Sequence, residues 1–244
     1  MLQKDSVGRT IIYKKAYDGD LQCVQSILQE GRRRNKTIQV IDAADEEGFT
    51  PLFQASYYGH TEVVKYLVQN GANVNAESNQ KDRRSEGING LIIGCEKGYE
   101  KIVKLLILYG ADIDHQTQNG VDCAYLAAQF NNLKILKLIL PTNPHLVSRR
   151  VHKGLTILHT AAYYGYYEVL KYILEQNNNS VNDKENYFKS TPLRSAIQYN
   201  GDLKMVKLLI NSGADPQLLS DGKTPLQIAR ENNKKEIQDY LNTL

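Results

Sequence analysis

The chain contains 244 residues, of which 41% are apolar, so it is large enough for one large domain or two small ones. Its net charge of +3 is too small to indicate a nucleic-acid-binding protein by itself, and no apolar run reaches the ~20 residues that a membrane-spanning helix needs. The start lacks an apolar stretch of the signal-peptide kind, and three cysteines form no even-numbered framework. These features predict a cytoplasmic protein in a reducing compartment.

One residue pattern, seen clearly in "GFTPLFQASYYGHTEVVKYLVQNGANVN" (48–75), recurs along almost the whole chain. Successive copies begin 40, 39, 33, 34, 35 and 33 residues apart. A period near 33 predicts a solenoid of stacked repeats instead of a single closed core. The copies start near Gly8, Gly48, Gly87, Gly120, Gly154, Lys189 and Gly222.

The first repeat, "GRTIIYKKAYDGDLQCVQSILQEG", has the features of an end cap. Lys15 occupies a position that is small in the inner repeats, and a lysine there is tolerable only on an outer face. Seven residues are added around 32–47, before the second repeat, and they predict a lengthened loop or finger.

The second repeat shows how each copy forms two helices. Thr50 is a predicted N-cap and Pro51 takes the first helical position, where a missing N–H costs nothing. Ala55 keeps this first helix thin, and Gly59 supplies the left-handed conformation that ends it. A second helix is then predicted by an apolar stripe of Val63, Val64 and Leu67.

The third repeat departs from the pattern in ways that predict a weak first helix. Six residues are added around 76–86, and Gly90 and Gly94 replace the usual proline and alanine. Each glycine costs a helix roughly 1 kcal/mol relative to alanine. We therefore expect this repeat to open more easily than the others. Cys95 replaces a small packing residue and Cys123, in the next repeat, replaces the motif proline; both are predicted to be structural.

The later repeats, 120–140, 154–182 and 190–216, follow the same template, and the final one ends in the polar segment "ENNKKEIQDYL". A polar outer face is what an end cap requires. The variants "TPLFQA", "TILHTA", "TPLRSA" and "TPLQIA" resemble the T-P-L-H-x-A motif of ankyrin repeats. The resemblance covers about seven repeats within residues 7–241 and implies one all-α solenoid domain, made of stacked helix–turn–helix units with projecting hairpin-like fingers.

Aromatic residues gather where this resemblance implies a concave binding face. The two residues before each helix-ending glycine and the residues at the finger tips lie there in ankyrin-like stacks, and folding requires no apolar residue at these sites. Tyrosine offers a large, fairly rigid contact area with a polar tip, which suits interfaces. An alternative is that the rings only stack between repeats and stiffen the solenoid. The predicted partner-binding residues are Phe49, Tyr57, Tyr58, Phe130, Tyr163, Tyr164, Tyr187, Phe188 and Tyr199.

Three basic clusters lie in connections between repeats, at 31–36, 81–85 and 148–153. Acidic residues nearby offset the first two, and only the third is locally basic without compensation. Solvated loop charge explains such clusters in most proteins. The functional alternative is an anion-binding surface formed by Arg149, Arg150 and Lys153.

No residue pattern predicts catalysis or a cofactor. The five histidines have no zinc-site spacing, and no phosphate-binding loop or nucleophile elbow occurs. By the resemblance, His60 and His159 hydrogen-bond the turns between repeats. The repeats also leave no segment long enough for a separate catalytic domain.

The sequence therefore predicts a non-enzymatic module without cofactor or metal that binds a partner protein through its concave face. It predicts no small-molecule substrate, and nucleic acid is a poorer fit because no continuous basic stripe is present. The lysine- and asparagine-rich composition suggests a bacterial effector delivered into a host cytosol. The competing hypothesis is a scaffold whose basic loops contact a phosphorylated partner or an anionic membrane.

Overall fold

The structure of the chain is a computed structural model, and it describes residues 3–79, 86–177, 179–186 and 189–244. Two of the predicted partner-binding residues, Tyr187 and Phe188, and the basic cluster at 81–85 lie outside the described residues. The chain divides into two compact halves, Met1–Cys123 and Ala124–Leu244. Each half is described by itself.

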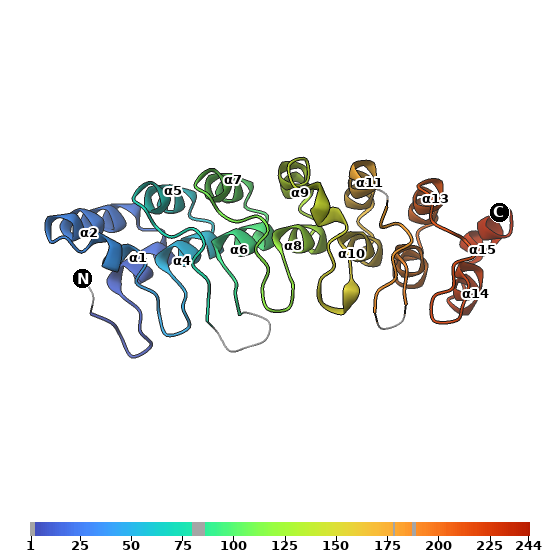
Figure 1. Cartoon of the computed structure of the whole chain (residues 1–244), viewed down its shortest axis with the longest axis horizontal. Coiled ribbons are helices and arrows are strands. Elements are labelled where there is room, and N and C mark those ends of the chain that lie inside the picture. The colour runs from blue at the N-terminus through green and yellow to red at the C-terminus, as the bar shows by residue number, and fades with distance from the viewer. Residues whose placement is uncertain (1–2, 80–85, 178, 187–188) are drawn as a thin grey trace. The chain divides into compact units, whose positions relative to one another are not determined.

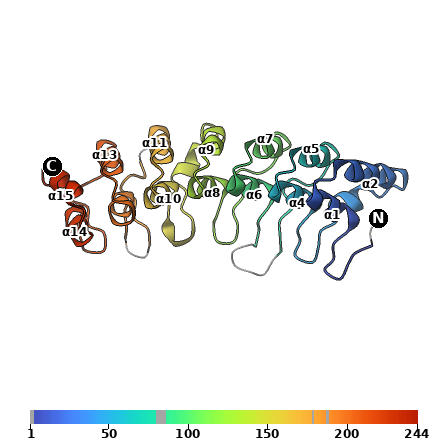
Figure 2. The ribbon, with the colours of Figure 1, turned by 180° about the vertical axis from the view of Figure 1, so that it is seen from behind.

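In the N-terminal half, first helices of successive repeats pack side by side in one row, and second helices form another row (Figures 1 and 2). We call the row of first helices the inner row, because the loops between repeats project beside it (Figure 1). The inner row consists of α1 (Ile11–Asp18), α4 (Pro51–Tyr57) and α6 (Gly90–Lys97). The outer row consists of α2 (Leu21–Arg33), α5 (Thr61–Gln69) and α7 (Glu100–Leu108), and the short α3 (Thr37–Ile41) lies in the added segment.

Local sequence explains where the inner helices begin and end. The side chains of Thr10, Thr50 and Asn89 each accept a hydrogen bond from a backbone N–H of the first turn, as N-caps do. Gly98 ends α6 at a φ of 75°, a left-handed conformation that glycine adopts without strain. The buried apolar stripe of α5 contains the predicted residues Val63, Val64 and Leu67.

The two glycines of α6 lie where neighbouring helices come close. A Cβ atom at Gly90 would be 3.1 Å from the Ser56 Oγ atom, and one at Gly94 would be 3.2 Å from a Val103 methyl group. These contacts explain why small residues are favoured there. Whether α6 opens more easily than other helices stays a prediction.

The cysteines depart from the sequence-based interpretation. The chain was expected to lack a disulfide framework, but Cys95 of α6 is bonded to Cys123, with the two Cα atoms 5.4 Å apart. Cys23 is the free cysteine. The expectation was wrong because an odd number of cysteines does not prevent two of them from becoming neighbours when repeats stack. Both bonded cysteines are buried, which agrees with the structural role predicted for them.

The C-terminal half repeats the same two-row arrangement (Figures 1 and 2). Its inner row consists of α8 (Cys123–Gln129, which begins at the last residue of the N-terminal half), α10 (Ile157–Tyr164), α12 (Pro192–Ser195) with its continuation η3 (Ala196–Asn200), and α14 (Pro225–Glu231). Its outer row consists of α9 (Leu133–Ile139), α11 (Tyr167–Gln176), α13 (Leu203–Asn211) and α15 (Lys235–Leu241). Two 3₁₀ turns, η1 (Pro144–Val147) and η2 (His152–Gly154), lie between α9 and α10. The described residues form helices and loops without a β-strand, which confirms the predicted all-α class.

The two consensus histidines hydrogen-bond between repeats, as predicted. His159 is buried, and its Nε2 atom lies 2.9 Å from the Ser190 carbonyl oxygen and 3.1 Å from that of Asp183. The His60 Nε2 atom lies 2.9 Å from the Tyr17 carbonyl oxygen. Each imidazole therefore links its own repeat to an adjacent one.

Candidate functional site

Exposed tyrosines of α1 and α4 form a first aromatic cluster in the N-terminal half. Tyr17, Tyr57 and Tyr58 are 47%, 37% and 41% exposed, although they are large amphipathic side chains. The Tyr17 and Tyr58 ring centroids are 4.4 Å apart, and those of Tyr57 and Tyr58 are 4.9 Å apart. Rings from neighbouring repeats therefore touch each other and still present a large area to solvent.

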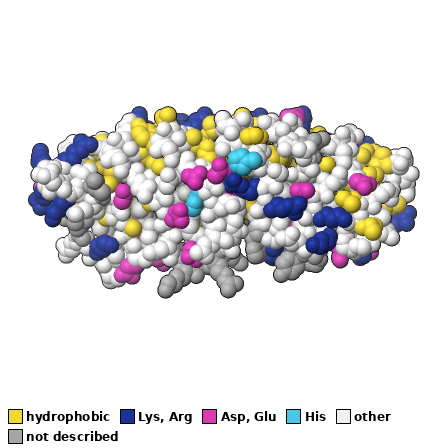
Figure 3. Space-filling model, in the orientation of Figure 1, with side chains coloured by type: hydrophobic (Ala, Val, Ile, Leu, Met, Phe, Trp, Pro, Cys, Tyr) yellow, Lys and Arg dark blue, Asp and Glu magenta, His cyan; other side chains and the backbone are white. Residues whose placement is uncertain are grey.

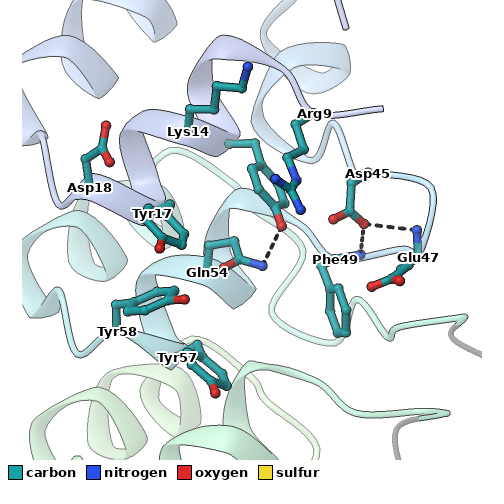
Figure 4. A pocket seen from close by; sticks show the side chains of 11 residues that line it. Arg9, Lys14, Tyr17, Asp18, Asp45, Glu47, Phe49, Gln54, Tyr57 and Tyr58 are labelled. Carbon is teal, nitrogen blue, oxygen red and sulfur yellow. Dashed lines mark hydrogen bonds between the residues drawn. The ribbon is translucent and has the colours of Figure 1, made fainter. Parts of the chain in front are cut away.

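A groove of about 620 Å³ lies beside this cluster and is called the first groove. Figure 4 shows Tyr17, Tyr57 and Tyr58 on one side of it and Phe49 of the finger on the other. The Phe49 ring also stacks on Phe53 of α4, with centroids 4.4 Å apart. Both α4 and the finger before it thus contribute aromatic walls, as the sequence predicts for finger and helix positions.

Polar groups of the first groove are bonded to one another. The buried Gln54 side chain donates a hydrogen bond from its Nε2 atom to the Tyr13 hydroxyl oxygen at 2.7 Å. Asp45 accepts hydrogen bonds from the backbone N–H groups of Glu47 and Phe49 at 3.1 and 3.0 Å (Figure 4). Burial raises the pKa of Tyr13, and the nearby Asp45 carboxylate raises it further. The Tyr13 phenol is therefore neutral at physiological pH.

Charged and hydroxyl groups also shape the surface of the first groove. Its lining contains two cations and three carboxylates, so its net formal charge is 2 − 3 = −1. The hydrogen bond with Tyr17, followed by partial burial, raises the pKa of Tyr58 to about 12. The Tyr58 phenol is therefore neutral at physiological pH. The charged lining residues are Arg9, Lys14, Asp18, Asp45 and Glu47.

A second aromatic cluster lies on α10 and η3 in the C-terminal half. Tyr163, Tyr164 and Tyr199 are 45%, 44% and 52% exposed. The Tyr163 and Tyr199 ring centroids are 4.4 Å apart, the same spacing as for Tyr17 and Tyr58. Phe130, which follows α8, is 47% exposed. The described aromatic residues that the sequence singled out in this half are thus exposed, as predicted.

The helix that carries Tyr199 contains one extra residue. The N-cap Thr191 and the helix-ending Gly201 are ten positions apart, whereas Thr156 and Gly165 are nine apart. The structure accommodates the insertion as a π-helical turn over Ala196–Asn200. Such turns occur mostly as single insertions in α-helices and are frequent at functional sites.

The extra turn borders a second groove of about 440 Å³. Its walls include the rings of Tyr163 and Tyr199 and the side chain of Leu155. Its charged lining residues are Lys153, Arg194 and the buried Glu185, which give a net formal charge of 2 − 1 = +1. The second groove is therefore basic where the first groove is acidic.

The predicted anion-binding residues have different environments. Arg150 is engaged within the protein, because its guanidinium donates to the carbonyl oxygens of Gly154 and Lys184 and lies 3.2 Å from an Asp183 carboxylate oxygen. Lys153 lines the second groove. Arg149 is half-buried and is not a lining residue of that groove. The structure does not bring the three cations into one groove.

Charged side chains of both signs are spread over the described surface. Figure 3 shows Lys and Arg side chains interspersed with Asp and Glu side chains on the face toward the viewer. None of the described helices combines the length and the apolar character that crossing a bilayer requires. Within the described residues, no group of three or more His, Cys, Asp or Glu side chains is placed to hold a metal ion.

Sequence reasoning did not single out Tyr13, Gln54 or Arg194. Arg194 stands in "TPLR", where the resembled motif has histidine, and this substitution was the signal that could have drawn attention to it. The buried Tyr13–Gln54 pair joins residues 41 positions apart, and no local pattern indicates such a pair.

Stacked pairs of antiparallel helices with projecting loops define an α-solenoid repeat protein. The ankyrin-repeat family model matches residues 1–78, 91–185 and 176–242 in three copies. The chain therefore belongs to the ankyrin-repeat family. Ankyrin repeats generally act as non-catalytic modules that mediate protein–protein interactions.

Relatives with this repeat differ widely in length. The chain is 31% identical over 194 residues to the ankyrin repeat protein YahD of Escherichia coli (strain K12), and the match covers 77% of this chain and 92% of YahD. It is 32% identical over 196 residues to alpha-latrotoxin-Lg1a of Latrodectus geometricus, covering 80% of this chain and 14% of the toxin. It is 27% identical to the human transient receptor potential cation channel subfamily A member 1, covering 86% of this chain and 18% of that protein.

Two solved structures share the fold. The ankyrin repeat domain of human ASB11 superposes with a TM-score of 0.77 at 22% identity, covering 96% of this chain and 97% of that domain. The ankyrin repeat domain of Bcl-3 superposes with a TM-score of 0.79 at 22% identity, covering 97% and 100%. At this level of identity the likeness establishes the fold alone.

Proposed function

We propose that this chain binds a partner protein through the aromatic surface of its inner-row helices, the face that the family resemblance predicts to be concave. The observation that carries the proposal is the exposure of the rings. Large amphipathic rings on the inner rows remain 37–52% exposed at positions that helix packing does not require to be aromatic. Buried at an interface, such rings supply a large share of binding free energy.

Ring stacking between repeats supports this function and does not replace it. Contacts such as Tyr17–Tyr58 at 4.4 Å hold each ring in one orientation. A ring that is already ordered loses less conformational freedom when a partner binds, so the free energy of binding is more favourable. On this proposal the stacked rings form a preorganised surface. The alternative, in which the rings only stiffen the solenoid, predicts instead that removing them lowers the melting temperature strongly.

The second candidate is a scaffold that contacts a phosphorylated partner or an anionic membrane through basic loops. Its support is the third basic cluster, in which Lys153 lines the second groove. The contacts of Arg150 with Asp183 and with two carbonyl groups weigh against it, because a guanidinium already bonded to acceptors of its own chain offers fewer donors to a ligand. Loop-driven binding collapses as salt rises from low to moderate concentration, whereas aromatic binding weakens little.

The experiment compares ring variants with a matched control. A partner captured by the immobilised wild-type chain is titrated against a variant in which Tyr57, Tyr58, Tyr163 and Tyr164 are replaced by alanine. We expect each ring to contribute about 2 kcal/mol, or about thirtyfold in affinity, so that the quadruple variant loses measurable binding. Tyr109→Ala is the control, because Tyr109 follows the outer-row helix α7 and is 39% exposed.

Thermal melts of the same variants separate binding from folding. A quadruple variant that melts normally and still binds at full strength would contradict the proposal and favour the basic loops. Cytoplasmic location and an effector role in a host cell belong to this proposal as well, and the lysine- and asparagine-rich composition is their support.

A further inference from the structure

Arg194 of the second groove has a buried donor atom without a hydrogen-bond partner among the described residues. Its Nε atom donates to the Gln198 side-chain oxygen at 3.1 Å. Its Nη1 atom is buried, and no described residue accepts a hydrogen bond from it. A buried charged donor without an acceptor costs free energy, and a ligand acceptor that reaches this guanidinium would recover part of that cost.

Side chains at the same helix position in two other repeats are hydrogen-bonded. Arg194 lies three residues after the N-cap Thr191, as His159 lies three after Thr156 and Tyr13 three after Thr10. His159 bonds Thr156 and two carbonyl oxygens, and Tyr13 accepts a hydrogen bond from Gln54. Arg194 differs from these two side chains because one of its donor atoms is unpaired.

The surroundings of Arg194 indicate which kind of acceptor fits. Arg194 and Lys153 bring two positive charges to the groove, and the buried Glu185 brings one negative charge. Glu185 accepts a hydrogen bond from the Ser190 backbone N–H at 3.1 Å. The net charge of +1 is neutralised by one carboxylate, whereas a doubly charged phosphate would place excess negative charge near Glu185.

Apolar contacts are available beside the cation. Tyr163, Tyr199 and Leu155 line the same groove, and the π-helical turn carries Gln198 and Tyr199 on the helix that holds Arg194. A ligand with a carboxylate next to an apolar group would pair with Arg194 and cover these side chains.

We propose that Arg194 binds the side-chain carboxylate of an Asp or Glu residue in an extended segment of the partner protein, with an adjacent apolar residue of that segment against Tyr163 and Tyr199. This inference rests on the proposed protein-binding function. It specifies the chemistry of the partner segment that binds to the C-terminal half of this chain. An arginine suits a carboxylate ligand, because its planar guanidinium presents two hydrogen-bond donors in one plane.

Selection from a display library of random twelve-residue peptides tests the proposal. The wild-type chain and the variants Arg194→Met, Arg230→Met and Tyr163→Ala are immobilised in parallel. We expect one Asp or Glu position beside an apolar residue to be enriched on wild type and on Arg230→Met, and to be lost on Arg194→Met. Arg230 is the matched control, because it is an exposed arginine of α14 that does not line the groove.

A selected peptide then gives a quantitative test on the wild-type chain, which does not depend on how a variant folds. Replacing the enriched Glu by Gln should weaken binding at least tenfold on wild type and less than twofold on Arg194→Met. Phosphoserine at the same position should bind more weakly than Glu, and tighter binding of phosphoserine would overturn the carboxylate assignment.

The outcomes separate this inference from the proposed function. Peptides that require Tyr163 but show no acidic preference would overturn the Arg194 inference and leave the aromatic binding surface in place. If the Glu→Gln change in the peptide weakens binding equally on wild type and on Arg194→Met, the Arg194 inference is overturned and the aromatic binding surface stays in place. Failure to select any peptide that depends on Tyr163 would overturn both.

Discussion

The first and second grooves are built from equivalent repeat positions, but they offer different chemistry. Both have tyrosine rings from adjacent repeats with centroids 4.4 Å apart. In the first groove, Tyr13 and Gln54 bond each other and the lining carries a net charge of −1. In the second groove, Arg194 has an unpaired donor and the lining carries a net charge of +1. Under the proposed function the rings of both halves contact the partner, and we expect the residues that vary between repeats to decide what each groove accepts.

The comparison also shows how a one-residue insertion can alter a repeat. The first groove is bordered by α4, which keeps the common spacing between N-cap and glycine. The second is bordered by α12 and η3, in which the extra residue is absorbed by the π-helical turn. Because a repeat contacts only its neighbours, such a change remains local and the remaining stack is preserved.

The largest effect on stability is expected for the polar pair of the first groove. Tyr13→Phe removes the acceptor of the Gln54 Nε2 group, which is buried, and should lower the free energy of unfolding by about 1–3 kcal/mol. Urea denaturation measures this change. The double variant Tyr13→Phe with Gln54→Leu should recover most of the loss, since both partners are then apolar. A Tyr13→Phe variant as stable as wild type would show that the hydrogen bond between Tyr13 and Gln54 does not stabilise the fold. The pair would then be no energetic difference between the two grooves.

A smaller effect is expected from ring stacking, and it should be alike in the two halves. Double-mutant cycles of Tyr17 with Tyr58 and of Tyr163 with Tyr199 should each give a coupling free energy of about 0.5–1.5 kcal/mol, because both ring pairs have the same spacing. Thermal unfolding of the single and double alanine variants measures the coupling. A coupling near zero in one half would mean that its rings are ordered by something other than each other.

Mild acid should affect the C-terminal half through His159. Burial lowers the pKa of this imidazole below its ordinary value of 6.5, so the folded chain holds it neutral while the unfolded chain takes up a proton. The stabilisation is therefore complete above about pH 6.5 and is lost as pH falls toward the folded-state pKa. The free energy of unfolding of wild type, relative to His159→Gln, should decline from pH 7 to pH 5.5. A difference that does not change with pH would contradict the assignment.

The smallest effect is expected from Asp20 in the N-terminal half at stronger acidity. Hydrogen bonds from Cys23, followed by the contact with Lys15 at 3.2 Å, lower the pKa of Asp20 from 3.8 to about 2. Its stabilising contribution is present above about pH 3.8 and is lost as pH falls through about 2. Asp20→Asn keeps the N-cap, so its melting temperature should be slightly below that of wild type at pH 7 and equal near pH 2. A constant gap would exclude the carboxylate charge as its cause.

Much of the candidate site could be predicted because the repeat fixes which positions face away from the core. Tyr57, Tyr58, Tyr163 and Tyr164 directly precede the residues that end their helices, and a single repeat is enough to place them on the exposed surface. The sequence did not indicate how the basic residues of the predicted anion-binding surface are paired. Arg150 and Lys153 are close in sequence, and Arg150 pairs with Asp183, a carboxylate from a later connection. Local charge does not reveal which cation a distant carboxylate will neutralise.

The sequence by itself determined the family, the all-α class and the helix pairs of the repeats, because caps, glycine ends and apolar stripes act within a few residues of one another. Only the tertiary structure decided that Cys95 bonds Cys123, that Tyr13 meets Gln54, and that Arg194 retains an unpaired donor. Each of these depends on side chains from adjacent repeats, some 28 to 41 positions apart where two residues pair. Stacking sets those distances, and the spacing of residues along the chain does not contain them.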